Sequence, residues 1–379
     1  MRLKSFFRFL ILLTLFLFSS HIFAYPTYIR LNYSSCLACH QSAEGGGSLS
    51  AYGKGIAYTE SYLSREYTAT KENSFLNFEG KMEHSLEARV MVLERLYDYS
   101  GNKTRIFPMQ LDYTNSIKWK KDLRQEITFA VAPNTARQKG VDSDTAKQSS
   151  WINRLYLRTF KLDYSIDKNN HLVFGGSNLP MGLHLIDHTA YVRERNRLGV
   201  SDVPIQVQYL RLNKQWQQTY LLFAPNPSDN IANRESGFAT KQEFFLMPNL
   251  VLGPQTLLAF GKSINRGLLG AFTKWGAGPW AIMSELDFTK REIKNSKMKF
   301  DQWSSLIEAH YFIQEYFRTS LGVQFLKVDS PFSEKEELYT FNNEFKFSPH
   351  VSFIVEYRQK STDLLLEKTL FGQIFLNWW

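Results

Sequence analysis

Both cysteines of the chain lie within five residues, where positions 36–40 read Cys-Leu-Ala-Cys-His. Two thiols separated by two residues, with a histidine directly after the second, form the arrangement that binds haem covalently. Each thiol can form a thioether to one vinyl group, and the histidine can then ligate the iron. We therefore predict that Cys36 and Cys39 attach one haem c, with His40 as the proximal iron ligand.

Three other uses of such a cysteine pair compete with this interpretation. A thioredoxin-type redox pair needs a surrounding βαβ pattern, which the sequence lacks. A zinc site needs two further ligands nearby, and the next histidine is His84. A disulfide across so short a loop would be strained. Covalent haem is therefore the expected cofactor.

A run of glycines follows the motif at Gly45, Gly46 and Gly47, and Tyr52 comes a few residues later. Such a run is either a flexible linker or backbone that passes close to the porphyrin, where no side chain would fit. Both interpretations remain open, and these four residues are our candidates for packing against the haem.

The single haem motif, the three glycines and the Tyr52-Gly53 pair resemble the N-terminal segment of exported cytochrome–barrel fusion proteins of Gram-negative bacteria. The resemblance is most specific over residues 30–55. It implies an electron-transfer role at the outer membrane.

The N-terminus has the pattern of an export signal. Arg2, Lys4 and Arg8 precede an apolar stretch at 9–18, and a small residue, Ala24, offers a cleavage position. The apolar core of about ten residues is too short to span a bilayer of about 30 Å. We predict that residues 1–24 are a cleaved signal peptide, and that the mature protein lies in the outer membrane of a Gram-negative bacterium.

Composition excludes several classes of protein. Apolar residues make up 44 % and charged residues 21 %, which argues against wholesale disorder. Aromatic residues reach 15 % at a mean hydropathy of −0.31. No run of 18 apolar residues follows the N-terminus, so a helical membrane protein is excluded. The net charge of +9 is not gathered into clusters interleaved with aromatic residues, so we expect no nucleic-acid partner.

Residues 75–379 alternate between apolar and polar with a period of two. On one such stretch Ile205 and Val207 share one face and Gln206 and Gln208 the other; further stretches are centred on 280–289, 316–327 and 351–358. A soluble β-sandwich would alternate too, but these strands run to ten to thirteen residues, against a usual length of about five or six. Short turns also alternate with long polar segments such as 134–149 and 225–236. We predict an all-β fold: a transmembrane antiparallel β-barrel of about 16 strands, with a range of 14–18.

The C-terminal residues resemble the last strand by which outer-membrane proteins are recognised for assembly. The chain ends Phe375-Leu376-Asn377-Trp378-Trp379. Phe375 and the terminal aromatic residue fit that pattern, whereas Asn377 departs from it and Trp379 replaces the more usual Phe.

The haem segment, 25–74, is too short to build a sufficient apolar core by itself. We therefore predict that it packs as a plug inside the barrel formed by 75–379.

The sixth iron ligand is less defined. Residues 178–202 do not alternate, and a segment of this size can fold inward. The Asp187-His188-Thr189 run after Gly182-Leu183 resembles a run in cytochrome–barrel relatives, which favours His188 as the ligand, with Asp187 orienting its ring.

Met181, His184 and His310 are the alternative sixth ligands, and a five-coordinate or water-ligated iron is a further possibility. His310 alternates with Ile307, Ala309 and Tyr311, so we expect it to point into the lumen. Arg193, Arg195 and Arg197 could bind haem propionates, although a solvated basic loop is the preferred interpretation of these three.

These observations predict an electron carrier at or across the outer membrane. Its partners would be outer-membrane lipid and periplasmic or extracellular cytochromes or other redox acceptors, because one haem cannot cover the full thickness of the membrane. Two alternatives remain: a porin-like channel with a redox- or gas-sensing haem plug, and a peroxidase-like haem enzyme with five-coordinate iron.

Overall fold

The computed structural model describes residues 23–25, 27–31, 39–40, 49–63, 82–96, 103–131, 155–183, 185, 189–198, 203–226, 234–329 and 333–378. The expected signal peptide therefore lies almost wholly outside the described residues, as do Cys36, the three glycines 45–47, His184 and His188. No helix in the described ranges is both long enough and apolar enough to cross a membrane.

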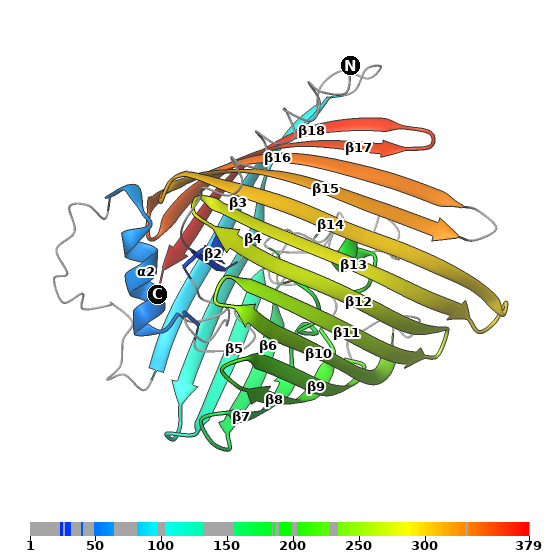
Figure 1. Ribbon diagram of the computed structural model, residues 1–379, viewed down its shortest axis with the longest axis horizontal. Coiled ribbons are helices and arrows are strands. Elements are labelled where there is room, and N and C mark those ends of the chain that lie inside the picture. The colour runs from blue at the N-terminus through cyan, green and yellow to red at the C-terminus, as the bar shows by residue number, and fades with distance from the viewer. Residues whose placement is uncertain are drawn as a thin grey trace, which may run out of the picture.

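The described strands β3 to β18 form one closed barrel of 16 antiparallel strands, which confirms the predicted fold class and strand number (Figure 1). Each strand pairs with its neighbours in the sequence, and β18 pairs with β3 to close the barrel. The first eight are β3 (Met82–Leu96), β4 (Lys103–Lys118), β5 (Leu123–Val131), β6 (Leu155–Ser165), β7 (Asn170–Gly176), β8 (Ile205–Leu212), β9 (Trp216–Ala224) and β10 (Glu235–Met247). The others are β11 (Leu250–Gly261), β12 (Ile264–Ala277), β13 (Trp280–Ile293), β14 (Met298–Gln314), β15 (Phe317–Asp329), β16 (Glu334–Ser348), β17 (Val351–Thr362) and β18 (Leu366–Trp378).

Alternation along each strand separates an apolar outer face from a polar lumen. On β13, Leu286 points outward while Glu285 and Asp287 are buried inside. On β8, Gln206 and Gln208 are buried and Val207 is exposed on the outside. This pattern suits a barrel whose outer face contacts lipid and whose interior holds polar groups.

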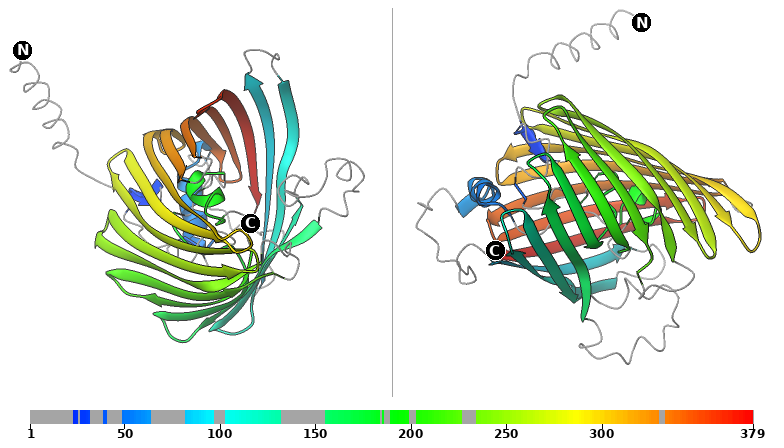
Figure 2. Two further views of the ribbon diagram at one scale, coloured as in Figure 1. Left: turned by 90° about the vertical axis from the view of Figure 1, so that its right-hand side faces the viewer. Right: turned by 90° about the horizontal axis from the view of Figure 1, so that it is seen from below.

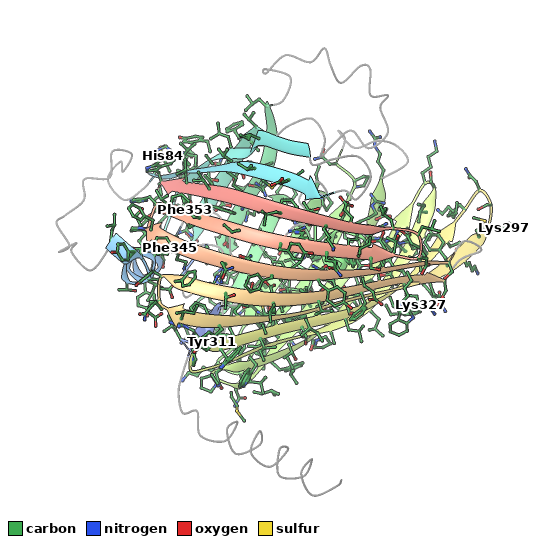
Figure 3. The ribbon with its side chains drawn as sticks, turned by 90° about the horizontal axis from the view of Figure 1, so that it is seen from above. His84, Lys297, Tyr311, Lys327, Phe345 and Phe353 are labelled. Atoms are coloured by element: carbon green, nitrogen blue, oxygen red, sulfur yellow. The ribbon has the colours of Figure 1, made fainter. Side chains whose placement is uncertain are left out.

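Aromatic side chains gather in two belts on the outer face. Trp280 and Tyr311 pack with ring centroids 4.7 Å apart near one end, and Phe288 and Trp303 pack at the same separation toward the other. Figure 3 shows Tyr311 near the end opposite Lys297 and Lys327. Such belts are typical of the two interfaces of a membrane.

The two ends of the barrel differ. Tight turns at 213–215, 248–249, 278–279, 315–316 and 349–350 lie at the end that we call the short-turn end, together with the end of β18. The opposite end carries longer connections, including 177–204 and 225–234. In bacterial outer-membrane barrels the short turns face the periplasm.

The N-terminal elements lie at the short-turn end (Figure 1). The short strands β1 (Phe23–Tyr25) and β2 (Thr27–Ile29) pair antiparallel. Ile29 is buried among Val251, Ala281 and Phe312 of the barrel wall. The guanidinium of Arg30 lies 4.1 Å above the Phe312 ring and forms an ion pair with Glu315. These contacts fix the start of the described chain inside the barrel end.

Helix α2 (Ala51–Thr59) lies across the same end and is held at its C-terminal side by the barrel rim. Glu60 is buried and pairs with Lys346 at 2.7 Å. Tyr62 packs on aromatic residues of the rim, with ring centroids 5.2 Å from Tyr316 and 5.8 Å from Phe345. An ion pair and an aromatic cluster therefore fasten the helix to β16 and the adjoining turn.

We expect the outward face of β15 to lie in lipid. Leu321 is 62 % exposed in the middle of this strand. A charge at this position would lie in lipid, so Leu321→Arg should lower the free energy of unfolding in liposomes by about 2–4 kcal/mol. Leu364→Arg, at a turn residue 97 % exposed, is the matched control and should change stability by about 0.5 kcal/mol or less. Equal effects of the two substitutions would contradict a lipid-facing β15.

Candidate functional site

A cavity of about 530 Å³ lies in the lumen between the N-terminal segment and the barrel wall. The N-terminal segment contributes Cys39, His40, Leu49, Gly53, Ile56 and Ala57. Strands β3 and β13 to β18 supply the wall, and Leu185, Thr189 and Ala190 of the 177–198 segment close the side toward the longer connections. Its volume is within the usual range of cofactor sites, about 300–1,000 Å³.

Cys39 and His40 reach the cavity because the chain folds back on itself. His40 forms an isolated antiparallel bridge with Leu49, and the Ser50 N–H donates to the Cys39 carbonyl oxygen at 2.8 Å. Ser50 then begins α2, because its hydroxyl accepts the Gly53 N–H at 3.0 Å. The two motif residues are thus positioned by the first turn of the helix.

Gly53 is the residue that lets α2 approach the motif. A Cβ at this position would lie 2.1 Å from the Cys39 carbonyl oxygen, which no real side chain tolerates. Tyr52, the residue we expected to pack on the haem, is 51 % exposed and is not among the cavity-lining residues. The helix phase therefore brings Gly53, and not its neighbour, against the motif.

A glycine substitution tests this close approach. Gly53→Ala should displace Cys39 and His40 and cost about 1–3 kcal/mol, because the added methyl group meets backbone that cannot move freely. Gly55→Ala is the matched control: nothing lies within 4 Å of its added Cβ, and alanine favours a helix by up to about 1 kcal/mol. Protease resistance of the N-terminal segment should fall in the first variant only.

The segment 177–198 crosses the lumen, as the lack of alternation predicted (Figure 2). It carries the short helix α3 (Tyr191–Glu194). The Leu183 N–H donates to a Glu285 carboxylate oxygen at 2.7 Å, and the Tyr191 N–H donates to Gln324 at 2.8 Å. Strands β13 and β15 thus hold its backbone. Burial and the nearby Glu336 raise the pKa of the Tyr191 hydroxyl, so it remains protonated at neutral pH.

Asn196 ties the same segment to the wall through its side chain. Its amide nitrogen donates to Asp287 at 2.7 Å and its oxygen accepts from Thr289 at 2.9 Å and from Gln302 at 2.8 Å. Gln255 bridges Glu285 and Asp287, at 2.8 Å from each. A polar network of this kind holds the segment in one arrangement.

The three arginines of this segment are not a solvated loop, and that expectation is wrong. Arg193 is buried and donates to the Met181 carbonyl oxygen at 2.5 Å. Arg195 lies 2.9 Å from Glu336, and Arg197 lies 2.7 Å from Glu235. Wall carboxylates pair with Arg195 and Arg197, and a backbone carbonyl oxygen accepts from Arg193, so these three side chains anchor the segment.

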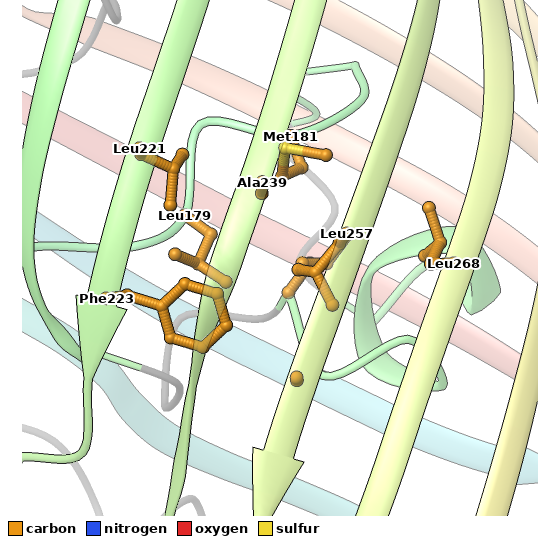
Figure 4. Close-up of a cluster of buried hydrophobic side chains, with 9 residues drawn as sticks. Leu179, Met181, Leu221, Phe223, Ala239, Leu257 and Leu268 are labelled. Atoms are coloured by element: carbon orange, nitrogen blue, oxygen red, sulfur yellow. The ribbon is translucent and has the colours of Figure 1, made fainter.

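Met181 is removed from the cavity. Its side chain is fully buried in an apolar cluster beside the barrel wall (Figure 4). The cluster consists of Leu179, Met181, Leu198, Leu221, Phe223, Ala239, Leu257, Ala259 and Leu268. Met181 thus packs as a core residue and is not brought together with Cys39 and His40.

Of the alternatives, the structure brings His310 to the cavity. It points into the lumen from β14, as predicted, and is only 5 % exposed. Neither of its ring nitrogens has a hydrogen-bond partner, although a Glu308 oxygen lies 3.4 Å from Nε2. His188 and His184 lie outside the described residues, so their predicted roles remain predictions.

Sequence reasoning missed two cavity-lining methionines, Met91 and Met283, and did not favour His350 among the possible sixth ligands. Alternation was the signal that could have found Met283, since it shares the inward face of β13 with Glu285. His350 lies in the turn after β16, where its Nδ1 contacts the Asn377 carbonyl oxygen at 2.8 Å.

Charged side chains of the cavity wall occur as pairs. Arg89 lies 2.6 Å from Glu87, Arg318 pairs with Glu344, and Arg358 pairs with Glu356. Two of these arginines also lie above aromatic rings, 4.4 Å from Phe375 and 4.8 Å from Phe371. The wall therefore offers guanidinium groups beside apolar surface.

Within the described ranges, no group of three or more His, Cys, Asp or Glu side chains could hold a bare metal ion. The residues present nevertheless fit a covalent haem c. Two members of the attachment motif face a cavity of suitable volume that has apolar, basic and histidine side chains on its wall. Leu49, Ile56, Met283 and Leu306 are apolar residues of this lining.

Comparisons with known proteins find the fold but not a family. No protein-family description and no curated protein matches the sequence. Solved structures do match: OmpT of Vibrio cholerae superposes with a TM-score of 0.61 at 8 % identity, covering 80 % of this chain and 100 % of that one. The fold is that of outer-membrane porins.

Two further matches agree. The anion-selective porin from Comamonas acidovorans has a TM-score of 0.58 at 9 % identity and covers 78 % of this chain and 99 % of its own. The outer membrane channel DcaP of Acinetobacter baumannii has a TM-score of 0.59 at 12 % identity, with 79 % and 99 % covered. At these identities the likeness concerns the barrel alone.

Proposed function

We propose that this protein is an outer-membrane barrel that carries one covalent haem c in its lumen and transfers electrons at or across the membrane. The observation that carries the proposal is the position of Cys39 and His40 on the wall of the lumen cavity. A motif placed there exposes a redox group to the inside of the barrel while the lipid-facing strands shield it.

The chain itself supplies the attachment. The thiols of Cys36 and Cys39 add across the two vinyl groups; each S–H hydrogen goes to the vinyl group, so no oxidant or reductant is consumed. His40 then offers its imidazole to the iron. Bound in this way, a haem c supplies one-electron exchange.

Residues of the cavity wall would surround the haem. Arg89 and Arg358 line the cavity, and each already pairs with a wall carboxylate, Glu87 or Glu356, so a propionate would have to share these guanidinium groups. The segment 177–198 covers the cavity toward the longer connections and limits water from that side.

The cavity lies toward the short-turn end, where α2 and the end of β18 are found. Since short turns face the periplasm in outer-membrane barrels, the nearer partner is a periplasmic electron carrier. A single haem in this position does not reach the half of the barrel that lies toward the longer connections. Exchange with the outside therefore needs a second carrier or a diffusing redox substrate that enters the lumen.

A porin-like channel with a haem plug is the second candidate. The fold likeness to structures described as an anion-selective porin and an outer membrane channel favours it. The polar inner face of the strands supports it as well.

Removal of the two thiols tests the haem. Cys36→Ser with Cys39→Ser should abolish haem staining of the barrel band on a denaturing gel of outer-membrane fractions, because both thioether positions are lost. Cells that make the unsubstituted protein are the control. Staining of the doubly substituted band would contradict the proposal.

Reconstitution separates the two functions. Vesicles that contain the haem-loaded protein and an enclosed redox dye should reduce the dye when a reduced periplasmic cytochrome is added outside, and planar bilayers should show little steady current. Large currents without dye reduction would favour the channel.

A further inference from the structure

We propose that His310 would be a second protein ligand of the haem iron, in addition to His40. This inference rests on the proposed function, because it presupposes a haem in the lumen cavity. It assigns to β14 a role that the motif at 36–40 cannot fill, since that motif supplies a single histidine.

The first argument is that the imidazole of His310 is buried without a hydrogen-bond partner. The residue is 5 % exposed, and neither Nδ1 nor Nε2 forms a hydrogen bond. A buried polar atom left in this state is unfavourable, and each such atom calls for an explanation such as an ion or cofactor. An iron bound to one nitrogen removes this cost.

The second argument is position. His310 and His40 line the same cavity, one from the barrel wall and one from the N-terminal segment. The residues that flank His310 in the neighbouring strands are Ala281 and Ser320. Both are small, so neither of these two side chains fills the space beside the imidazole, although Ile29 packs on Ala281 from the N-terminal segment.

The third argument concerns the second ring nitrogen. A Glu308 carboxylate oxygen lies 3.4 Å from Nε2. A carboxylate near one nitrogen of a ligating histidine holds the proton there and leaves the lone pair of the other nitrogen for the metal. Glu308 is placed for this role, and its distance can shorten when the ring is held by iron.

Other described candidates fit the ligand role less well. His350 already contacts the Asn377 carbonyl oxygen through Nδ1. Met283 packs in an apolar cluster with Leu183, Val192, Phe272 and Leu306. Met181 lies in the separate cluster of Figure 4.

The test is spectroscopic and uses the full-length, haem-loaded protein in detergent. The unsubstituted protein should give a low-spin spectrum in both oxidation states and bind CO poorly when reduced. His310→Ala should become high-spin and bind CO readily, with haem staining unchanged. Added imidazole should return this variant to low spin, because it can occupy the vacated ligand position.

His350→Ala is the matched control, since it removes another cavity histidine and should keep the low-spin spectrum. Heat-dependent gel migration checks that each barrel is folded, and His310→Gln serves where the alanine variant does not fold. A haem-containing His310→Ala protein that stays low-spin would overturn this inference and leave the proposed function standing. Unsubstituted protein without haem would overturn the proposed function itself.

Discussion

Backbone hydrogen bonding inside a lipid layer is the constraint on which the whole molecule depends. A strand exposed to hydrocarbon must pair each N–H and C=O group with a neighbouring strand, so the sheet has to close. The pairing of β18 with β3 meets this requirement and removes both edges. Closure in turn forces every second side chain inward, and this places Glu285, Asp287 and Gln302 in a narrow interior where they need partners.

Segments that lie inside the barrel provide these partners. The segment 177–198 brings Asn196 to the wall network, while its arginines meet Glu235 and Glu336. At the short-turn end, Arg30 and Glu60 give Glu315 and Lys346 their partners. Polar groups of the wall and of the inserted segments thus satisfy one another, because a buried charge without a partner is strongly unfavourable. His310 is an exception on this wall, because neither of its ring nitrogens has a hydrogen-bond partner.

Features that depend on neighbouring residues could be predicted from the sequence, whereas features that depend on residues far apart in the chain could not. Alternation is local, so the inward face of β15, with Arg318 and Gln324, was predictable, as were the barrel and the lumen-facing His310. The arginine partners were not, since Arg195 and Glu336 lie far apart in the chain and meet only through the barrel curvature. The choice between Tyr52 and Gly53 depended on the phase of a nine-residue helix, which a glycine-rich stretch does not specify. Val203 belongs to the same alternating run as Ile205 and Val207, but it lies before β8 and is buried.

The attachment of α2 to the barrel rim bears on the order in which the protein assembles. Cys39 is buried beneath the first turn of this helix, and the helix is in turn fastened to β16 by Glu60 and Tyr62. Attachment of the proposed haem would require access to the thiols, and in the complete barrel Cys39 is buried against α2, which is held by β16. The N-terminal segment also leaves the secretion machinery before β16 does. If the protein carries the proposed haem, the burial of Cys39 favours attachment before the barrel is complete.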